Sequence, residues 1–196
     1  MSTESIQLGC DDALLLIDLQ NDFLPEGALA VPDGDAIVPV LNSYIERFTT
    51  KALPVFASRD WHPDSHCSFS AQGGTWPKHC VAGTAGAQFA IELELPDDTI
   101  IISKATQPDK DAYSAFEDTE LHSLLQRQGL KRLFIGGLAT DYCVVNTVMD
   151  ALKLGYTVVL LADAIAAVNV HAGDGINAEK KMLNAGARAI TKNQLQ

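Results

Sequence analysis

The sequence predicts an α/β fold, in which a six-stranded, mostly parallel sheet lies between two layers of helices in a Rossmann-like, three-layer α/β/α arrangement. Short apolar runs rich in β-branched residues alternate with stretches of helical periodicity, which is the pattern of a parallel sheet covered on both faces. The 196 residues are 47% hydrophobic and 20% charged, as in globular proteins. No repeat or low-complexity tract divides them, so we expect one domain over residues 1–196.

Six apolar runs are expected to form the strands. They cover, in chain order, residues 13–17, 53–58, 99–103, 132–136, 157–162 and 187–191. A first helix is predicted over residues 37–48, where apolar side chains recur at helical spacing and Pro39 occupies the first turn. Leu121 and Leu125 mark a second helix that ends before Gly129. Further helices are predicted over residues 141–154 and 175–184.

Residues 63–86 break this alternation. The segment contains four glycines and places Trp76 directly before Pro77, so it is predicted to be a long ordered loop. Loops longer than about 12 to 15 residues are uncommon in compact domains unless they carry function. Together with the residues that precede it, the segment is expected to form a metal-binding loop region at about residues 60–86.

The charge balance disfavours some partners. The chain carries 14 Lys and Arg against 25 Asp and Glu, a formal net charge of −11, whereas nucleic acids and anionic membranes attract clustered basic residues. We therefore expect a small-molecule substrate, with no nucleic acid and no membrane as partner. The N-terminal residues lack the pattern of a secretory signal, and no apolar run approaches a membrane span of about 20 residues. A cytoplasmic location with reduced cysteines is expected, with a homo-oligomer as a possible assembly.

Reactive side chains follow four of the predicted strands. Asp18 ends the first, Asp60 the second and Lys104 the third, and the fourth leads to Cys143. In a parallel sheet the carboxyl ends of the strands meet at one edge, where ligands bind. We therefore expect a carboxylate base, an ammonium group and a thiol nucleophile to form one catalytic site from Asp18, Lys104 and Cys143.

Cys143 is predicted to lie in the first turn of a helix. Thr140 is a candidate N-cap, and the helix dipole would then favour a thiolate at Cys143. A buried structural cysteine is the alternative interpretation, and the converging charged groups disfavour it. Asp163, which ends the fifth predicted strand, is expected to be a helix cap or a turn residue rather than a catalytic group.

A second cluster is predicted in the loop region. Asp60 and His62 are two residues apart in an extended segment, so their side chains share a face. His79 is the best candidate to complete a site with open coordination positions. Mixed oxygen and nitrogen ligands suit one divalent ion, Zn²⁺, Fe²⁺ or Mn²⁺, that acts as a Lewis acid.

Two alternatives to this metal site stay open. The pairs His66-Cys67 and His79-Cys80 could form a closed structural zinc site, or the histidines could be scattered over the surface. A related hypothesis is a non-catalytic zinc-binding or thiol-sensing protein, in which Cys67, Cys80 and Cys143 are ligands or redox switches. This hypothesis predicts that chelation unfolds the protein and that Cys143→Ala preserves its function.

Five segments carry a resemblance that spans nearly the whole chain. They are residues 18–23 (DLQNDF), 59–63 (RDWHP), 76–84 (WPKHCVAGT), 103–104 (SK) and 137–144 (GLATDYCV). In this order they resemble the cysteine amidohydrolases of the isochorismatase-like superfamily. Isochorismatases lack the nucleophile at Cys143, and the DWH and WPKHC segments are similar to those of the metal-dependent nicotinamidase branch.

This resemblance implies an isochorismatase-like fold and a hydrolase of linear amides. The expected reaction converts nicotinamide to nicotinate and ammonia through a cysteine thioester, a step of NAD salvage, and pyrazinamide is an expected second substrate. Asp18 would accept the proton of Cys143, and Lys104 would stabilise the charged pair. The backbone N–H groups of Ala139 and Cys143 would form an oxyanion hole, next to a cis peptide bond between Leu138 and Ala139.

The metal site and the pocket walls follow from the same resemblance. It implies that Asp60, His62 and His79 hold the metal, which would bind the pyridine nitrogen of the substrate. Four positions match residues that line the family's substrate pocket: Phe23, Trp76, Tyr113 and Leu138.

One position departs from the family pattern. Some relatives carry a further histidine where this chain has Ser68, so water is expected to complete the ligand set. His66 lies close in sequence, and we expect it behind the ligands rather than among them. An amidase for ureido or carbamoyl compounds is a further alternative, which would not need the site of Asp60, His62 and His79.

Overall fold

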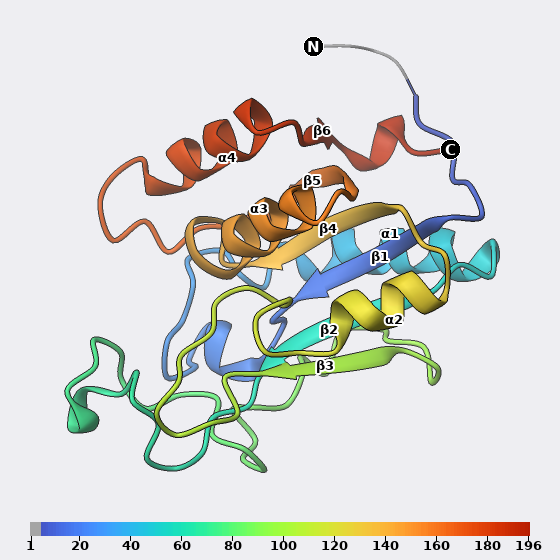
Figure 1. Cartoon of the computed structure of the whole chain (residues 1–196). Coiled ribbons are helices and arrows are strands. Elements are labelled where there is room, and N and C mark those ends of the chain that lie inside the picture. Colours follow the sequence, from blue (N-terminus) through green and yellow to red (C-terminus); the bar gives the residue numbers. More distant parts are fainter. Residues whose placement is uncertain (1–4) are drawn as a thin grey trace.

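The computed structural model describes residues 5–196 and confirms the α/β prediction (Figure 1). In this part of the chain six strands form one sheet in the order β3-β2-β1-β4-β5-β6. The strands are β1 (Asp12–Ile17), β2 (Val55–Asp60), β3 (Ile100–Lys104), β4 (Arg132–Leu138), β5 (Thr157–Ala166) and β6 (Arg188–Ile190). Every neighbouring pair is parallel, so the sheet is all-parallel where a mostly parallel one was expected.

Helices cover both faces of the sheet. They are α1 (Val38–Thr50), α2 (Leu121–Arg127), α3 (Val145–Lys153) and α4 (Asp174–Asn184). Figure 1 shows α1 behind the sheet and α2 and α3 in front of it. Residues of α1 share one buried core with the sheet, whereas residues of α2, α3 and α4 share a second core on the opposite face. The strand order reverses between β1 and β4, and such a switch point opens a crevice at the carboxyl ends of the strands.

Strand β1 shows how one segment serves both cores. All six of its residues are buried, and successive side chains of a strand point to opposite faces. Leu14 and Leu16 pack in the core with α1, whereas Ala13, Leu15 and Ile17 pack in the core on the other face. A central strand of this kind is therefore a continuous apolar run in the sequence.

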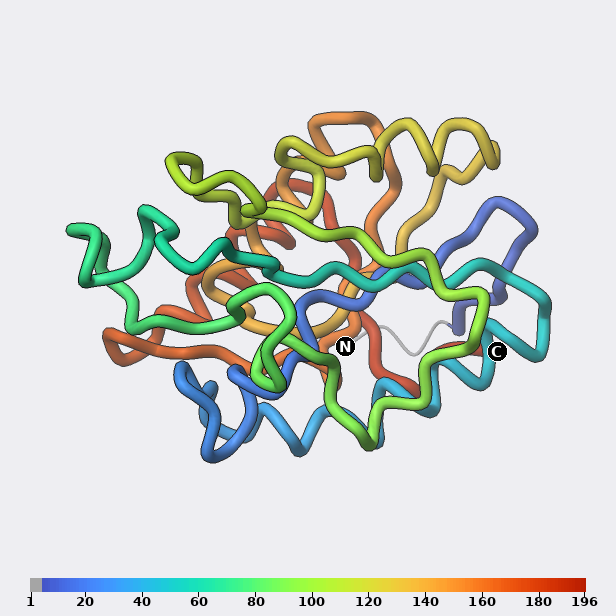
Figure 2. The backbone as a smooth tube through the Cα atoms, turned by 90° about the horizontal axis from the view of Figure 1, so that it is seen from below, coloured from blue at the N-terminus to red at the C-terminus, as the bar shows by residue number. Residues whose placement is uncertain are grey.

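The long loop predicted between the second and third strands is present. It leaves β2 at its carboxyl end and contains one short 3-10 helix, η2 (Ser70–Gln72), before β3 begins. Figure 1 and Figure 2 place the first, teal part of this segment beyond the carboxyl ends of β2 and β3, which run side by side, whereas the later green part returns to the amino end of β3. The first part of the loop therefore lies at the edge of the sheet where the reactive side chains were expected.

The helix expected over residues 141–154 is divided in two, so this prediction is corrected. A π-helix, η3 (Thr140–Val144), precedes α3. Ala139 is the residue before the π-helix, and no side chain caps it, so the expectation that Thr140 is an N-cap is wrong. π-Helical turns occur often at functional sites, and this one contains Cys143.

The prediction for Asp163 is also wrong. Asp163 lies inside β5, which continues to Ala166 through an irregular register with β4. Its carboxylate accepts hydrogen bonds from the Tyr44 hydroxyl and from the Lys192 N–H, both at 2.8 Å. These bonds fasten α1 and the C-terminal segment to the sheet, so Asp163 is neither a cap nor a turn residue.

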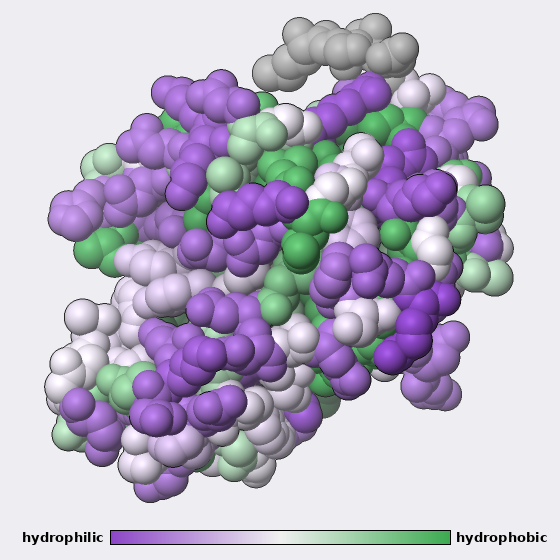
Figure 3. Space-filling model, in the orientation of Figure 1, coloured by the Kyte–Doolittle hydropathy of each residue, from purple (hydrophilic) through white to green (hydrophobic). Residues whose placement is uncertain are grey.

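The face of the molecule drawn in Figure 3 is largely hydrophilic. In the view of Figure 3, hydrophilic residues cover most of the molecule and the strongly hydrophobic colour is limited to small patches. Among residues 5–196, no helix is both long and apolar enough to cross a membrane.

Candidate active site

Of the three residues predicted to be catalytic, the buried lysine lies between the other two. Lys104 Nζ lies 3.0 Å from Asp18 Oδ2 and 3.4 Å from Cys143 Sγ. The same ammonium donates a short hydrogen bond to Asp60 and a further bond of 3.3 Å to the carbonyl oxygen of Ala112. The three catalytic candidates are thus together at the carboxyl ends of β1, β3 and β4, as their places at the strand ends predicted.

Burial and the neighbouring charge of opposite sign shift the pKa values of these groups in opposite directions. Burial disfavours the ammonium form of Lys104, but the adjacent carboxylates of Asp18 and Asp60 outweigh it and hold its pKa well above the ordinary value. The same ammonium holds the pKa of Asp60 below its ordinary value despite burial. For Asp18 burial is the larger effect, and it raises the pKa of this carboxyl.

The thiol of Cys143 does not show the low pKa expected at a helix start. Burial is the main cause that raises its pKa well above the ordinary value, and the carboxylates of Asp18 and Asp60 add to this, while Lys104 opposes it. The sequence argument considered the helix dipole and the nearby charged groups, but not the burial of the thiol, which depends on the assembled fold. Cys143 therefore needs a base to ionise it, and a carboxylate oxygen of Asp18 lies within 4.8 Å of the Cys143 sulfur.

Backbone groups at the end of β4 face the same space. The peptide bond between Leu138 and Ala139 is cis, as the resemblance implies. Leu138, Ala139 and Cys143 all line the pocket. The N–H groups of Tyr142 and Val144 both donate to the carbonyl oxygen of Ala139, which fixes the turn that carries Cys143.

Asp60, His62 and His79 form a compact buried cluster. One ligand atom from each lies within 4.8 Å of the others. The Nδ1 atoms of His62 and His79 lie 3.3 and 2.7 Å from the carbonyl oxygens of Ala105 and Pro77. A carbonyl oxygen can only accept, so both Nδ1 atoms carry the proton and both Nε2 atoms keep a lone pair.

These free nitrogens fit a metal ion. His62 Nε2 is buried without a hydrogen-bond partner and lies 3.6 Å from Asp60 Oδ2. Burial lowers the pKa of His79, which favours the neutral imidazole that binds metals. Two imidazole nitrogens and one carboxylate oxygen, with each imidazole oriented by a carbonyl, are a donor set suited to Zn²⁺, Fe²⁺ or Mn²⁺.

His66 is not part of this donor set. Its Nδ1 lies 2.7 Å from the Ser68 hydroxyl and its Nε2 lies 3.0 Å from the carbonyl oxygen of Lys110, so both nitrogens are engaged. Among the described residues, the clusters that could hold a metal include neither Cys67 nor Cys80. The geometry therefore does not support a closed structural zinc site built from the two His-Cys pairs.

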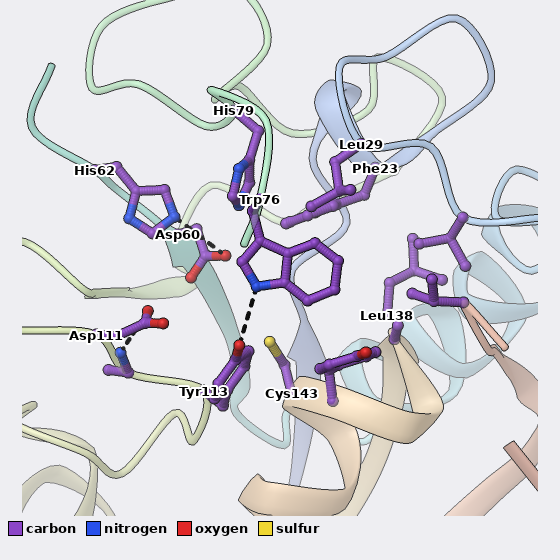
Figure 4. Close-up of a pocket in the computed structure, with 15 residues that line it drawn as sticks. Phe23, Leu29, Asp60, His62, Trp76, His79, Asp111, Tyr113, Leu138 and Cys143 are labelled. Atoms are coloured by element: carbon purple, nitrogen blue, oxygen red, sulfur yellow. Dashed lines mark hydrogen bonds and ion pairs between the residues drawn. The ribbon is translucent and has the colours of Figure 1, made fainter. Parts of the chain in front are cut away.

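Aromatic and aliphatic side chains enclose the space between the cluster and Cys143 (Figure 4). All four predicted wall residues line it: Phe23, Trp76, Tyr113 and Leu138. Trp76 Nε1 donates to the Tyr113 hydroxyl at 3.0 Å, and the Trp76 ring meets that of Tyr142 edge to face at 5.1 Å. Such walls suit a flat heteroaromatic ring.

Sequence reasoning missed several residues that line this pocket. They are Leu29, Val31, Asp111, Ala112, Tyr142 and Val168. The position of Tyr142 next to Cys143 was a signal that could have found it. The others come from loops whose path is set by contacts distant in sequence, and no local pattern marks them.

A parallel α/β sheet that brings a thiol, a carboxylate and an ammonium group together beside a cluster of potential metal ligands indicates the class of the protein: a hydrolase with a candidate cysteine nucleophile and a candidate metal site. Comparison with known families agrees. Residues 12–194 match the model of the isochorismatase domain. The chain belongs to the isochorismatase family.

Three relatives illustrate the likeness. The nicotinamidase of Escherichia coli strain K12 is 41% identical over 91% of this chain and 94% of the relative. The crystal structure of the pyrazinamidase of Pyrococcus horikoshii in complex with zinc is 48% identical, with a TM-score of 0.89 over 92% of this chain and 99% of that one. The structure of PnC1 from L. infantum in complex with nicotinate is 35% identical, with a TM-score of 0.90 over 98% of both chains.

Proposed function

We propose that this protein hydrolyses nicotinamide to nicotinate and ammonia, with Cys143 as nucleophile, and that it accepts pyrazinamide. The observation that carries this function is the pocket itself, whose aromatic walls enclose a space lined by both Cys143 and the cluster of Asp60, His62 and His79. The enclosure suits a flat ring, with a reacting amide at one end and a metal-binding ring nitrogen at the other. The nicotinamidases and the nicotinate complex among its relatives act on or hold such ligands.

The first half of the reaction forms a thioester. Asp18 accepts the proton of the Cys143 thiol, and the sulfur attacks the amide carbon, while Lys104 keeps the developing charges paired. The carbon–nitrogen bond then breaks, the leaving nitrogen receives the proton from Asp18, and ammonia departs. The raised pKa makes the Asp18 carboxylate a stronger base towards the thiol, and the proton that it takes up is then available to the leaving nitrogen.

The second half hydrolyses the thioester. Asp18 accepts a proton from water and the water oxygen attacks the thioester carbon. The carbon–sulfur bond then breaks to release nicotinate, and Asp18 returns its proton to the sulfur, which restores the thiol. The N–H groups of Ala139 and Cys143 are proposed to hold the oxyanion in both halves. One such donor typically contributes about 3 kcal/mol to the barrier reduction.

Asp60, His62 and His79 would hold one divalent ion per subunit, and zinc is the first candidate because the P. horikoshii structure is a zinc complex. When bound, this ion supplies a Lewis-acidic centre for the pyridine nitrogen, which would orient the ring. The chain's own residues do the remaining work: the aromatic walls bind the ring and exclude water, and Cys143, Asp18 and Lys104 perform the chemistry.

The decisive experiment measures ammonia release from nicotinamide by the purified protein, with zinc, iron or manganese added separately. Stoichiometric nicotinate and ammonia are expected. Absence of release with every metal would refute the proposal. Release from ureido or carbamoyl compounds but not from nicotinamide, with no loss on chelation, would instead support the alternative amidase.

A further inference from the structure

The short segment after β1 carries two polar side chains that the proposed reaction does not use. Gln20 is fully buried and Asp22 is half-buried, at and just inside the 3-10 helix η1 (Asn21–Phe23). Neither lines the pocket around Cys143. Each one bonds to the main chain at or directly beside a predicted metal ligand.

Gln20 completes the sheet where β1 ends. The register of β1 and β2 stops at the pair of Ile17 and Ser58, because Asp18 turns the chain with a φ of 51°. Asp60, two residues further along β2, is therefore left without a β1 partner. The Gln20 side chain takes that place: its Oε1 accepts from the Asp60 N–H at 2.7 Å and its Nε2 donates to the Asp60 carbonyl oxygen at 2.8 Å.

The same amide reaches the loop that follows His79. Gln20 Nε2 also donates to the carbonyl oxygen of Ala87 at 3.0 Å. A neutral amide can accept from one main-chain group and donate to two others, whereas a carboxylate lacks the donor and an apolar side chain lacks both. Loss of the amide would leave buried main-chain groups of Asp60 unpaired.

Asp22 acts in the same way on the second ligand segment. Its Oδ2 accepts from the N–H of Cys80 at 2.7 Å, and the Cys80 carbonyl oxygen accepts from the His62 N–H at 3.0 Å. Cys80 directly follows His79 and has a φ of 46°. The Asp22 carboxylate also packs closely against Gly86, because a Cβ placed on Gly86 would lie 2.2 Å from Asp22 Oδ2.

We propose that Gln20 and Asp22 are positioning residues that preassemble the metal site. Gln20 fixes the main chain of Asp60, and Asp22 fixes the peptide that joins His79 to Cys80 and thereby to His62. Ligands held in place before the ion arrives lose less conformational entropy on binding, so preassembly raises metal affinity. The proposal rests on the metal site of the proposed function.

The test compares these two residues with a control residue whose side-chain amide also bonds to the main chain. Asn42, which is not part of the metal cluster, also makes two hydrogen bonds to the main chain. Its Nδ2 donates to the Glu92 carbonyl oxygen at 2.8 Å, and its Oδ1 accepts from the Glu94 N–H at 3.0 Å. The variants are Gln20→Met, Asp22→Asn and Asn42→Leu. For each, zinc affinity is measured by competition with a chromophoric chelator, and the stability of the metal-free protein by denaturant unfolding.

Gln20→Met is expected to weaken zinc binding by roughly 10- to 100-fold, the range found for partners that orient metal ligands. Asp22→Asn, which keeps the size but accepts from one N–H group fewer, should weaken it by at least about threefold. Asn42→Leu should lower stability with zinc affinity within about twofold of the wild type. If Gln20→Met does not fold without zinc, Asp22→Asn decides the question.

Zinc affinities of the two variants within twofold of the wild type, or lowered no more than by Asn42→Leu, would overturn the positioning role. A wild-type protein that does not bind zinc overturns the metal site and this role together. A wild-type protein that binds zinc but does not hydrolyse nicotinamide contradicts the proposed function alone, since the affinities of the variants still test the positioning role.

Discussion

A single ammonium group organises the chemistry at the level of residues. Lys104 is buried beside two carboxylates and a thiol, and each of these groups would be costly to bury as an isolated charge. The pKa of Cys143 is raised mainly by burial, so the resting site holds a thiol and depends on Asp18 for activation. The nucleophile is therefore ionised only when the base accepts its proton.

Replacing Cys143 tests this arrangement. Cys143→Ala is expected to reduce nicotinamide turnover by about 10⁴-fold or more, because the covalent route is lost. Its fold and its zinc affinity should stay close to those of the wild type, since Cys143 is not one of the cluster of Asp60, His62 and His79. Ammonia release and chelator competition measure the two properties.

Cys67→Ser is the control for that variant. Cys67 is half-buried and does not line the pocket, so activity within about twofold of the wild type is expected. Residual activity of Cys143→Ala above a tenth of the wild type would argue against a thioester and for the thiol-sensing or zinc-binding hypothesis.

At the level of elements, the end of β4 is shaped by a close approach to β1. Gly137 has a φ of 128°, and a Cβ placed on it would lie 2.2 Å from the carbonyl oxygen of Ile17. The residues that follow, Leu138 and Ala139, line the pocket. The absence of a side chain at position 137 therefore lets the central strands meet directly beneath the site.

Gly137→Ala is accordingly expected to lower the free energy of unfolding by about 3 kcal/mol or more, because both the backbone angle and the space oppose a Cβ. Gly155→Ala is the matched control: Gly155 has a φ of 89° but nothing within 4 Å of the added carbon, so a cost of roughly 1 to 2 kcal/mol is expected. Denaturant unfolding measures both. Equal losses would show that the contact with Ile17 has no effect.

The contact of α1 with β5 gives a prediction about alkaline pH. Burial, together with the hydrogen bond to Asp163, raises the pKa of Tyr44 above its ordinary value of 10.0. A group whose pKa is raised on folding contributes stability that is complete below the unfolded pKa and is lost as pH rises towards the folded value. The contribution of Tyr44 is thus complete below about pH 10 and declines above it.

Tyr44→Phe is expected to cost about 1 kcal/mol at neutral pH, for the lost hydrogen bond to Asp163. The difference in unfolding free energy between wild type and variant should narrow above pH 10, because only the wild type has this phenol to ionise on unfolding. Denaturant unfolding at several pH values measures the difference. A gap that widens above pH 10 would contradict the assigned direction of the pKa shift.

For the whole molecule, the two hydrophobic cores lie between the sheet and its helices, while the metal-type cluster lies at the edge of the sheet. Metal removal should therefore leave the fold intact and abolish activity. Binding to the folded state alone stabilises it by about 2.7 kcal/mol at a free zinc concentration of 100 times the dissociation constant. We expect a lower melting temperature after chelation and recovery of both melting temperature and activity when zinc is restored.

Circular dichroism measures the melting temperature, and ammonia release measures the activity. Unfolding on chelation at 25 °C would favour a structural zinc site. Full activity after complete removal of the metal would favour the amidase for ureido or carbamoyl compounds. The single domain over residues 1–196 and the possible homo-oligomer stay predictions, and light scattering during size-exclusion chromatography tests the assembly.

The sequence by itself determined the alternation of strands and helices along the chain, the parallel arrangement of the sheet and the identity of the groups at the strand ends. These properties depend on local periodicity and on the rule that parallel strands end at one edge, which is why Asp18, Lys104 and Cys143 could be predicted to meet. The cluster of Asp60, His62 and His79 was predicted from the spacing of these residues and from the family resemblance.

Only the tertiary structure decided what surrounds those groups. It showed that Asp163 fastens α1 to β5, that His66 has both nitrogens engaged, and that burial beside carboxylates raises the pKa of Cys143. Each result depends on residues far apart in the chain. Desolvation and hydrogen bonding are properties of the assembled environment, so a local pattern can name the reactive groups but cannot set their protonation or their partners.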